Sequence, residues 1–243
     1  MTKLSVNLNK VALLRNQRDV GYPNVVEHAQ LILEAGGQGL TMHPRPDERH
    51  IRRSDVGAIE EFLSQWPDKE IELNIEGYPS DDFLALVTKH HCHQVTLVPD
   101  DPNQRTSDHG WDISKHKELL TDAIAQLHKA KRRVSLFADP DPAIAEQAKE
   151  VGTDRIELYT GPYAEKEIGV AQYVATAQNA LALDIEINAG HDLSLDNLTT
   201  FIKAIPECAE VSIGHAITAD ALKLGWTQTI ALYLEAIKKG HAT

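Results

Sequence analysis

The sequence predicts a parallel (β/α)8 barrel with a few extra helices, built as one domain over residues 1–243. Eight short apolar segments alternate along the chain with eight helical patterns, and strands that alternate with helices form a parallel sheet. Eight such units in 243 residues also match the usual size of this barrel, about 250 residues. A doubly wound open sheet is the alternative. Its glycine-rich first turn is missing from the segment NLNKVALLRN, which follows the first predicted strand.

The first half of the chain supplies four predicted strands, at residues 4–8, 39–43, 70–76 and 94–98. The segment 70–76, EIELNIE, alternates strictly between polar and apolar residues, which is the period of a strand. Proline, glycine and N-cap signals predict three helices here. The first begins at Pro23 and ends before Gly36-Gly37, the second is capped by Ser54 and ends near Trp66, and the third is capped by Ser80. The segment after the first strand, up to Arg18, is predicted to be a polar loop.

The second half supplies the other four predicted strands, at residues 133–137, 155–159, 184–189 and 210–213. Helices are predicted at residues 114–131, 140–151, 163–183, 195–204 and 219–239, with a break at Gly161-Pro162. A long polar loop, residues 100–112, follows the fourth strand and is a candidate lid.

The composition indicates a cytoplasmic protein. Two cysteines, Cys92 and Cys208, are too few for a disulfide scaffold and fit a reducing compartment. The first ten residues contain no apolar run of the signal-peptide kind, and no window reaches the roughly 20 apolar residues of a membrane span. The net charge of −12 disfavours binding to nucleic acid or to a membrane surface. If the ligand is an anion, the cations that bind it must gather locally.

Residues 40–51, LTMHPRPDERHI, carry the densest group of candidate ligand-binding side chains. The apolar run at their start must stop at about His43, because the two prolines after it cannot donate to a sheet ladder. The loop that follows holds Arg45, which suits a phosphate or a carboxylate. His43 and His50 can transfer protons near neutral pH. The alternative interpretation is a solvated polar loop.

The predicted barrel brings polar residues from distant parts of the chain to one rim. In barrels of this kind the functional face lies at the carboxyl ends of the strands. The polar residues predicted at these ends are Asn7, Asn9, His43, Arg45, Asn74, Glu76, Thr106, His191 and His215. We therefore predict a single site at this rim.

Gly190-His191 and Gly214-His215 follow the seventh and the eighth predicted strands. Barrel enzymes often bind phosphate with the loops at these two places, through backbone N–H groups at a helix N-terminus. Glycine lets the backbone approach such a ligand closely. The two pairs therefore favour a phosphate site, and the alternative is that the glycines only turn the chain.

Glu76 is the predicted carboxylate base. It ends the third strand, and a carboxylate that is partly shielded in a barrel mouth can have a raised pKa. The alternative is a salt bridge at the rim with Arg45. Glu72 lies deeper on the same face of the strand, where a charge needs a partner, so we interpret it as a structural carboxylate.

The segment His90-His91-Cys92-His93 has the composition of a metal site. It precedes the fourth strand, on the face opposite the predicted site, and adjacent side chains do not converge as tetrahedral ligands do. We therefore predict no metal there. The histidines interpreted as surface or incidental are His28, His90, His109, His116, His128 and His241, although His109 lies in the candidate lid.

The chain resembles the pyridoxine 5'-phosphate synthase family from about Leu4 to Gly240. The segments that carry the resemblance are VNLNKVALLRN, HPRPDERHI, LNIEG, TLVPD with the later Thr106, VSLFADPD, IELYTGPYA, INAGHDL and IGHAI. The resemblance implies a (β/α)8 barrel that forms homo-octamers. It implies condensation of 3-amino-2-oxopropyl phosphate with 1-deoxy-D-xylulose 5-phosphate, giving pyridoxine 5'-phosphate, phosphate and water, without a metal or an organic cofactor.

The resemblance also implies roles for individual residues. His43 and Glu76 become proton acceptors, and His191 becomes the proton donor. The residues implied to bind the amino-ketone phosphate are Asn7, Arg18, Gly214 and His215, and those implied to bind the deoxyxylulose phosphate are Arg45, His50 and Thr106. Asn9, Lys10 and Asp192 occupy further substrate-binding positions.

The chain departs from the family pattern in two places. An Asp-His pair usual after the first strand is Asn9-Lys10 here, and a glycine usual after the histidine of the seventh strand is Asp192 here. Lys10 can still bind a phosphate or a carbonyl oxygen, whereas an acid beside a phosphate is unfavourable unless only its backbone N–H faces the ligand. The interval from His50 to Glu76 is longer than the family suggests, so Glu72 remains a second candidate for the base.

Two other functions stay open on the residues alone. One is another sugar-phosphate enzyme, an isomerase, an epimerase or an aldolase, and the last would use a Schiff-base lysine at a strand end. Lys10 is the lysine in such a place. The other is a barrel that binds a pyridoxine phosphate without making it, which the presence of His43, Glu76 and His191 disfavours.

Overall fold

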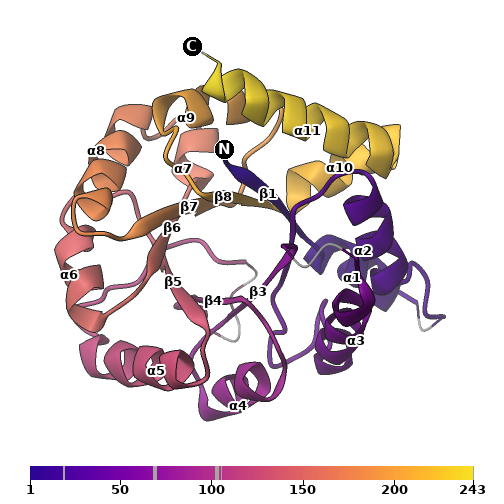
Figure 1. Cartoon of the computed structure of the whole chain (residues 1–243), viewed down its shortest axis with the longest axis horizontal. Helices are drawn as coiled ribbons and strands as arrows, with labels where there is room; N and C mark the ends of the chain where they lie inside the picture. The colour runs from indigo at the N-terminus through magenta and orange to yellow at the C-terminus, as the bar shows by residue number, and fades with distance from the viewer. Residues whose placement is uncertain (19, 68–69, 102–103, 105, 243) are drawn as a thin grey trace.

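The strands close into a barrel (Figure 1). The computed structural model describes residues 1–18, 20–67, 70–101, 104 and 106–242. The parallel strands pair in chain order, and the first also pairs with the last. Their bounds are β1 Lys3–Asn7, β2 Gly39–Met42, β3 Glu72–Gly77, β4 Gln94–Leu97, β5 Arg133–Ala138, β6 Arg155–Tyr159, β7 Glu186–Gly190 and β8 Glu210–Ile213. The predicted barrel is confirmed, and the doubly wound alternative is wrong.

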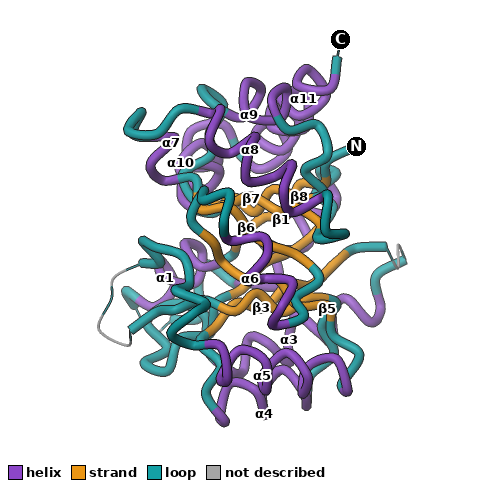
Figure 2. Tube along the Cα trace, turned by 90° about the vertical axis from the view of Figure 1, so that its left-hand side faces the viewer, coloured by secondary structure: helices purple, strands orange, loops and turns teal. Residues whose placement is uncertain are grey.

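Helices surround the strands on the outside of the barrel, as the side view in Figure 2 also shows. Their bounds are α1 Asn9–Asn16, α2 Val25–Glu34, α3 Arg53–Gln65, α4 Asp81–Lys89, α5 Lys117–Lys129, α6 Ile144–Val151, α7 Gly161–Ala164, α8 Val170–Leu181, α9 Leu198–Ala204, α10 His215–Leu224 and α11 Trp226–His241. The described residues thus form more helices than strands, and the predicted extra helices are confirmed.

Helix α1 corrects the prediction of a polar loop after the first strand. It buries Val11, Ala12 and Arg15 against the barrel, and its other side faces outward. An isolated helix of eight residues is not stable in water, so tertiary packing rather than local propensity forms it. The consequence for the site is that polar residues at both ends of α1 have fixed positions.

Several predicted helix boundaries are also wrong. Helix α2 begins after Asn24, not at Pro23, because the Asn24 side chain accepts the N–H groups of Val26 and Glu27. Helix α3 is capped by Asp55, whose carboxylate accepts the N–H of Arg52 at 2.7 Å, and not by Ser54. Ser80 caps α4 as predicted, through a bond from the Phe83 N–H.

The later helices differ from the prediction in two places. The segment Gly161-Pro162, expected to be only a break, opens the short helix α7, and α8 begins later, at Val170. The last predicted helix is two helices, α10 and α11. Gly225 separates them with a φ of +76°, which side-chain-bearing residues rarely adopt.

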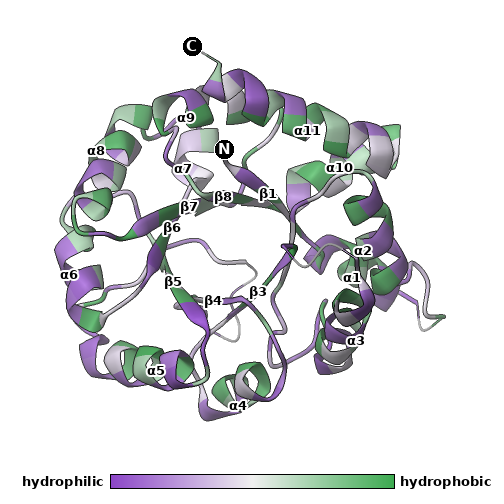
Figure 3. Ribbon diagram, in the orientation of Figure 1, coloured by the Kyte–Doolittle hydropathy of each residue, from purple (hydrophilic) through white to green (hydrophobic). Residues whose placement is uncertain are grey.

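The interior of the barrel is polar along its length. Alternate strand residues such as Leu4, Val6 and Leu40 face the helices and form the apolar core. The residues between them bond across the barrel to strands two places away: Asn7 to Glu76, Thr96 to Glu157, and Arg155 to Gln94. Figure 3 shows the matching hydrophilic colour on parts of β3 and β6. Barrels of this kind more often fill their interior with Val, Ile and Leu.

Candidate active site

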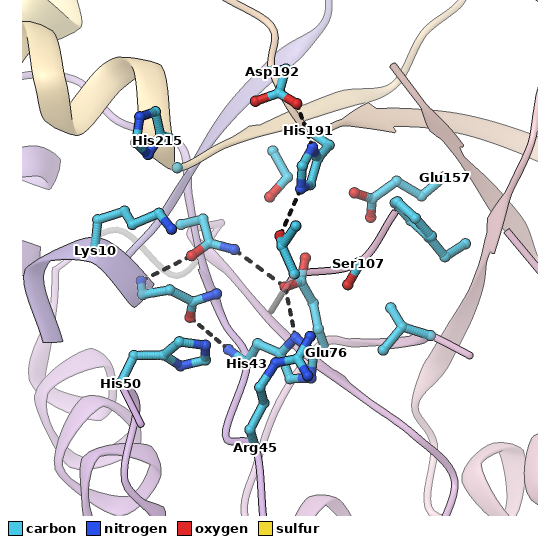
Figure 4. Close-up of a pocket in the computed structure, with 17 residues that line it drawn as sticks. Lys10, His43, Arg45, His50, Glu76, Ser107, Glu157, His191, Asp192 and His215 are labelled. Atoms are coloured by element: carbon cyan, nitrogen blue, oxygen red, sulfur yellow. Dashed lines mark hydrogen bonds and ion pairs between the residues drawn. The ribbon is translucent and has the colours of Figure 1, made fainter. Parts of the chain in front are cut away.

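A cavity of about 350 Å³ opens at the carboxyl ends of the strands (Figure 4). Its lining residues come from every quarter of the chain: Asn7, Asn9, Lys10, His43, Arg45, His50, Glu76, Val98, Thr106, Ser107, Phe137, Glu157, His191, Asp192, Ser212, Gly214 and His215. Asn74, which was predicted at the rim, does not line the cavity; it is buried and accepts a bond from Thr96 Oγ1 at 3.0 Å. Every residue with a predicted catalytic or binding role lines the cavity except Arg18. Arg18 is exposed, after the end of α1, and its role stays a prediction.

His43 is held at the end of β2 by the start of α1. The His43 N–H donates to Asn9 Oδ1 at 2.9 Å, and the Asn9 N–H donates to Asn7 Oδ1 at the same distance. Burial lowers the pKa of His43 well below its ordinary value, and the charges of Arg45 and His50 act in the same direction. His43 is therefore a neutral imidazole at pH 7, able to accept a proton.

Glu76 lies beside His43 in the cavity, on the adjacent strand β3. Asn7 Nδ2 donates to Glu76 Oε2 at 3.2 Å, and the same oxygen lies 3.9 Å from His43 Nδ1. Burial, followed by the charge of Asp100, raises the pKa of Glu76 to about 7. A carboxyl group that titrates there can both take and return a proton at neutral pH.

Arg45 does not form the salt bridge with Glu76 that was the alternative interpretation. Its guanidinium pairs with the buried carboxylate of Asp100 and donates to the Gln104 carbonyl oxygen at 3.1 Å. Ser107 also donates to Asp100, at 2.8 Å. The Arg45 side chain is 4% exposed, so an anion that reaches it must share it with Asp100.

His50 is fixed as a neutral hydrogen-bond donor. Its Nδ1 accepts the N–H of Ile51 at 2.9 Å, so the proton of the neutral ring lies on Nε2. Burial, with the charges of Arg45 and Lys10, lowers the pKa of His50 to about 4. The backbone is fixed as well, because Arg15 and Asn16 of α1 both donate to the His50 carbonyl oxygen.

The opposite side of the cavity combines the ends of β7 and β8 with helix N-termini. Gly214 is the N-cap residue of α10, His215 is its first residue, and Lys10 lies in the first turn of α1. Free N–H groups at a helix N-terminus attract anions, and Lys10 adds a positive charge. His191 and Asp192 complete this side, where the predicted phosphate site was placed.

Glu157 is the main cavity residue that the sequence interpretation missed. It lies on β6, is 3% exposed, and accepts a bond from Thr96 Oγ1 at 3.5 Å. Burial, then the charges of Glu76 and Glu210, raise the pKa of Glu157 well above the usual value and so favour its protonated form. A Cβ atom on Gly190 would lie 2.2 Å from Glu157 Oε1, so only glycine leaves room for this carboxyl group.

A signal for Glu157 is present in the sequence. Residues 155–159, RIELY, alternate as a strand, so Glu157 shares a face with Arg155 and Tyr159. The same alternation on β5 and β8 gives the cavity Phe137 and Ser212. Strand parity alone could therefore have added these three residues to the predicted site.

Two groups considered from the sequence lie at the other end of the barrel. Glu72 bonds to Lys3 Nζ at 3.2 Å and to Arg133, and it does not line the cavity. His90 Nδ1 lies 2.7 Å from Glu60 Oε2, and His93 Nδ1 accepts the Leu73 N–H at 3.0 Å. Among the residues that the structure describes, no group of three or more His, Cys, Asp or Glu side chains is arranged to hold a metal ion.

Residues 102, 103 and 105 of the candidate lid lie outside the described residues. The described part of this loop contacts both sides of the cavity mouth. The Gln104 carbonyl oxygen accepts bonds from Arg45 and Arg49, and Thr106 Oγ1 lies 2.9 Å from His191 Nε2. His109 pairs with Asp108 and does not line the cavity.

A closed parallel barrel that gathers acid–base and anion-binding groups at the carboxyl ends of its strands defines a (β/α)8-barrel enzyme site. The sequence model of one family, described as pyridoxal phosphate biosynthesis protein PdxJ, matches residues 4–239. The chain belongs to this family.

Relatives agree with this assignment. The chain is 52% identical to the pyridoxine 5'-phosphate synthase of Brucella anthropi, over 97% of this chain and 98% of the relative. It is also 52% identical to the protein of the same name from Mesorhizobium japonicum, over 96% and 98%. The chain can therefore be compared with these relatives over nearly its whole length, which includes the residues of the cavity.

Solved structures support the fold alone. The YdjI aldolase from Escherichia coli K12 matches with a TM-score of 0.65 at 12% identity, covering 98% of this chain and 89% of that one. A tryptophan synthase from M. tuberculosis matches with a TM-score of 0.64 at 15% identity, covering 100% and 93%. Within the described residues, no helix is both long enough and apolar enough to cross a membrane.

Proposed function

We propose that the chain is a pyridoxine 5'-phosphate synthase, an enzyme of vitamin B6 biosynthesis. It condenses 3-amino-2-oxopropyl phosphate with 1-deoxy-D-xylulose 5-phosphate to give pyridoxine 5'-phosphate, phosphate and water. Relatives that share about half of its residues bear this name. The observation that carries the proposal is that one cavity joins His43, Glu76 and His191 with anion-binding groups on two sides.

The two phosphorylated substrates bind on opposite sides of the cavity. Figure 4 places Arg45 and His50 on one side and Asp192 and His215 on the other. Asn7, Arg18, Gly214 and His215, with Lys10 and the backbone of Asp192, bind the amino-ketone phosphate. Arg45, His50 and Thr106 bind the deoxyxylulose phosphate, and Asn9 holds the strand end between them. The Arg45 fork suits a phosphate because it can donate two parallel hydrogen bonds.

The catalytic groups transfer protons and the reaction is of the transferase type. Joining an amine to a ketone, eliminating water and expelling phosphate each need a base and an acid near the reacting atoms. Glu76 is the base best matched to neutral pH, because its pKa is about 7. Neutral His43 is the second proton acceptor, and His191 is the donor. In its protonated form, which burial favours, Glu157 donates a hydrogen bond to oxygen atoms that gain negative charge.

The enzyme acts as a homo-octamer in the cytoplasm, without a metal or a cofactor. A set of large apolar side chains is exposed on α1, on the segment before α2, on α2 and on α10: Leu14, Val20, Tyr22, Leu31, Leu222 and Leu224. Helix α1 contacts both α2 and α10, so the helices that carry most of these residues share one flank of the barrel (Figure 1). Exposed apolar groups gathered in this way favour association with another chain. Light scattering on the purified protein measures the number of chains.

The test of the proposal is phosphate release by chelator-treated protein, with both substrates together and with each alone. We expect release only with both, accompanied by the absorbance of a new pyridine ring. No release from correctly folded protein would point first to Asn9-Lys10 and Asp192, and would then support the isomerase and non-catalytic alternatives. Lys10→Ala separates these further, because activity that survives this change excludes an imine at Lys10. Product binding without turnover would support the non-catalytic alternative.

A further inference from the structure

His191 is held by contacts on both ring nitrogens and on its edge. Its Nδ1 lies 2.7 Å from Asp192 Oδ2, and its Nε2 lies 2.9 Å from Thr106 Oγ1. The ring also packs at 74° against Tyr159, with centroids 5.3 Å apart. His191 and Asp192 have φ angles of +76° and +60°, so a tight turn of the backbone brings the two adjacent side chains together.

The Asp192 carboxylate determines which ring nitrogen carries the permanent proton. An ionised carboxylate can only accept a hydrogen bond, so His191 must donate to it from Nδ1. The hydrogen bond from His191 lowers the pKa of Asp192, against the effect of burial, and the charges of His191, His215 and Lys10 lower it further. Asp192 is therefore ionised at neutral pH, and Nε2 is the nitrogen left to exchange a proton.

Asp192 disfavours phosphate binding, because its negative charge lies on the side of the cavity that is proposed to bind a phosphate. Its carboxylate is close enough to Lys10 and His215 for their charges to affect it, and both line the cavity. A negative charge there weakens the attraction of these cations for a phosphate. A side chain that opposes ligand binding in this way needs a different benefit, and the contact with His191 supplies one.

We propose that Asp192 is a positioning residue for His191, whose carboxylate retains the Nδ1 proton so that Nε2 exchanges a proton with the substrate. The proposal rests on the assignment of His191 as the proton donor. In the donating step the proton on Nε2 moves to the leaving oxygen, and the N–H bond breaks as the O–H bond forms. The neutral ring keeps its Nδ1 proton, and Asp192 stays ionised throughout.

Two substitutions at position 192 test this without disturbing the backbone, because glycine and asparagine both tolerate a φ of +60°. In Asp192→Gly the ring loses its partner. In Asp192→Asn the amide can donate to Nδ1 and so stabilise the wrong tautomer. We expect kcat to fall by roughly 10-fold in the first and roughly 100-fold in the second. Both variants should bind inorganic phosphate more tightly in calorimetry, so kcat and KM should fall together.

The matched control is Asp154→Asn at the opposite end of the barrel. The Asp154 side chain is 39% exposed, against 40% for Asp192, and it lies 2.8 Å from His128 Nε2. This change removes the same kind of carboxylate–imidazole contact, and it should alter neither kcat nor phosphate affinity. A merely structural role for Asp192 would make the two aspartate variants behave alike.

A double variant shows whether Asp192 acts through His191. His191→Gln should lose most of the activity, and adding Asp192→Asn to it should cost no more than a further twofold. A larger additional loss, or a kcat of Asp192→Asn within twofold of the original, would overturn the proposal. If the original protein made no pyridine product, nitrogen-15 NMR of labelled histidine would still report the tautomer. A proton on Nδ1 of His191 that Asp192→Asn moves to Nε2 supports the proposal, and an unchanged tautomer contradicts it.

Discussion

Glu72 and Glu76 lie four residues apart on β3 and face the same interior, but their environments are opposite. Burial acts to raise the pKa of both. At Glu72 the hydrogen bond and the charge of Arg133, with those of Lys3, overcome it and lower the pKa. At Glu76 none of the cations among the described residues makes direct contact, Asn7 supplies one bond, and the pKa rises to about 7. One strand therefore carries a structural acid at one end and a candidate base at the other.

The difference between these two acids of β3 follows from the cations that contact Glu72, which are Lys3 and Arg133. Glu210 confirms the point from the other direction. It lies at the same end as Glu72, yet its carboxyl group accepts a bond from the Asn188 amide, at 3.4 Å. Its pKa also rises to about 7, through burial and then the charge of Glu72. The position of an acid along the barrel axis therefore does not explain whether its pKa is raised or lowered.

The largest expected effect separates the two acids of β3. Glu76→Gln removes the base and should lower kcat by roughly 1,000-fold, since positioned acid–base groups contribute about 100- to 10,000-fold. Glu72→Gln should change kcat less than about threefold, and should lower the melting temperature because Arg133 loses its partner. Steady-state kinetics and thermal unfolding of both variants measure this. Comparable kcat losses in the two would refute the assignment of Glu76 as the base.

The next effect concerns stability and Glu210. Its pKa is about 4.5 in the unfolded chain and about 7 in the folded one, so the folded state holds the proton more tightly. The folded state therefore loses stability as pH rises from about 4.5 to 7, and the full cost persists above 7. Glu210→Gln removes this cost, which corresponds to roughly 3 kcal/mol. Denaturant unfolding should show the gain at pH 8 and none at pH 4, and an equal change at both values would contradict the account.

A smaller effect should appear in the pH profile of the enzyme. A base with a pKa of about 7 makes kcat/KM fall below that pH. Asp100 raises this pKa by its charge, so Asp100→Asn should move the acidic limb to lower pH, by roughly one unit or less. Asp101→Asn is the control, because Asp101 is the next residue in the chain but its carboxylate is exposed and does not line the cavity. A limb that stays in place in Asp100→Asn would exclude Asp100 as a cause.

The smallest effect is expected at Lys3. It pairs with Glu72 at 3.2 Å, but its side chain is 36% exposed, and pairs of this kind contribute about 1 kcal/mol or less. Lys3→Met should therefore lower the free energy of unfolding by less than about 1 kcal/mol and leave kcat unchanged, since Arg133 still holds Glu72. Equilibrium unfolding in urea measures the change. A loss above about 2 kcal/mol would assign Lys3 a larger share in the ion-pair group.

The fold could be predicted because alternating strands and helices depend on local patterns. Strand ends marked by proline or glycine, as after His43 and at Gly190, also placed most of the cavity residues on one rim. Helix α1 could not be predicted, because tertiary packing rather than propensity stabilises its eight residues. The split at Gly225 depends on a single positive φ inside an otherwise continuous helical pattern.

The site was predictable at its rim and less so in its interior. Glu157 was missed because barrel interiors are usually apolar, although the alternation in residues 155–159 marks its face. The contact between His191 and Asp192 depends on two successive positive φ angles, which no periodicity reveals. The pairing of Arg45 with Asp100 joins residues 55 positions apart, so only the folded chain shows it.

The polar barrel interior has a thermodynamic consequence for the whole protein. Unfolding exposes Asn74, Thr96, Asn188 and their neighbours to water together with the apolar core. Exposed apolar surface raises the heat capacity by about 0.45 cal/K/mol per Å², whereas polar surface lowers it by about 0.26. We therefore expect a smaller heat capacity of unfolding than for an equally large barrel filled with Val and Ile. The free energy of unfolding should then change less steeply with temperature, in the cold as well as in the heat.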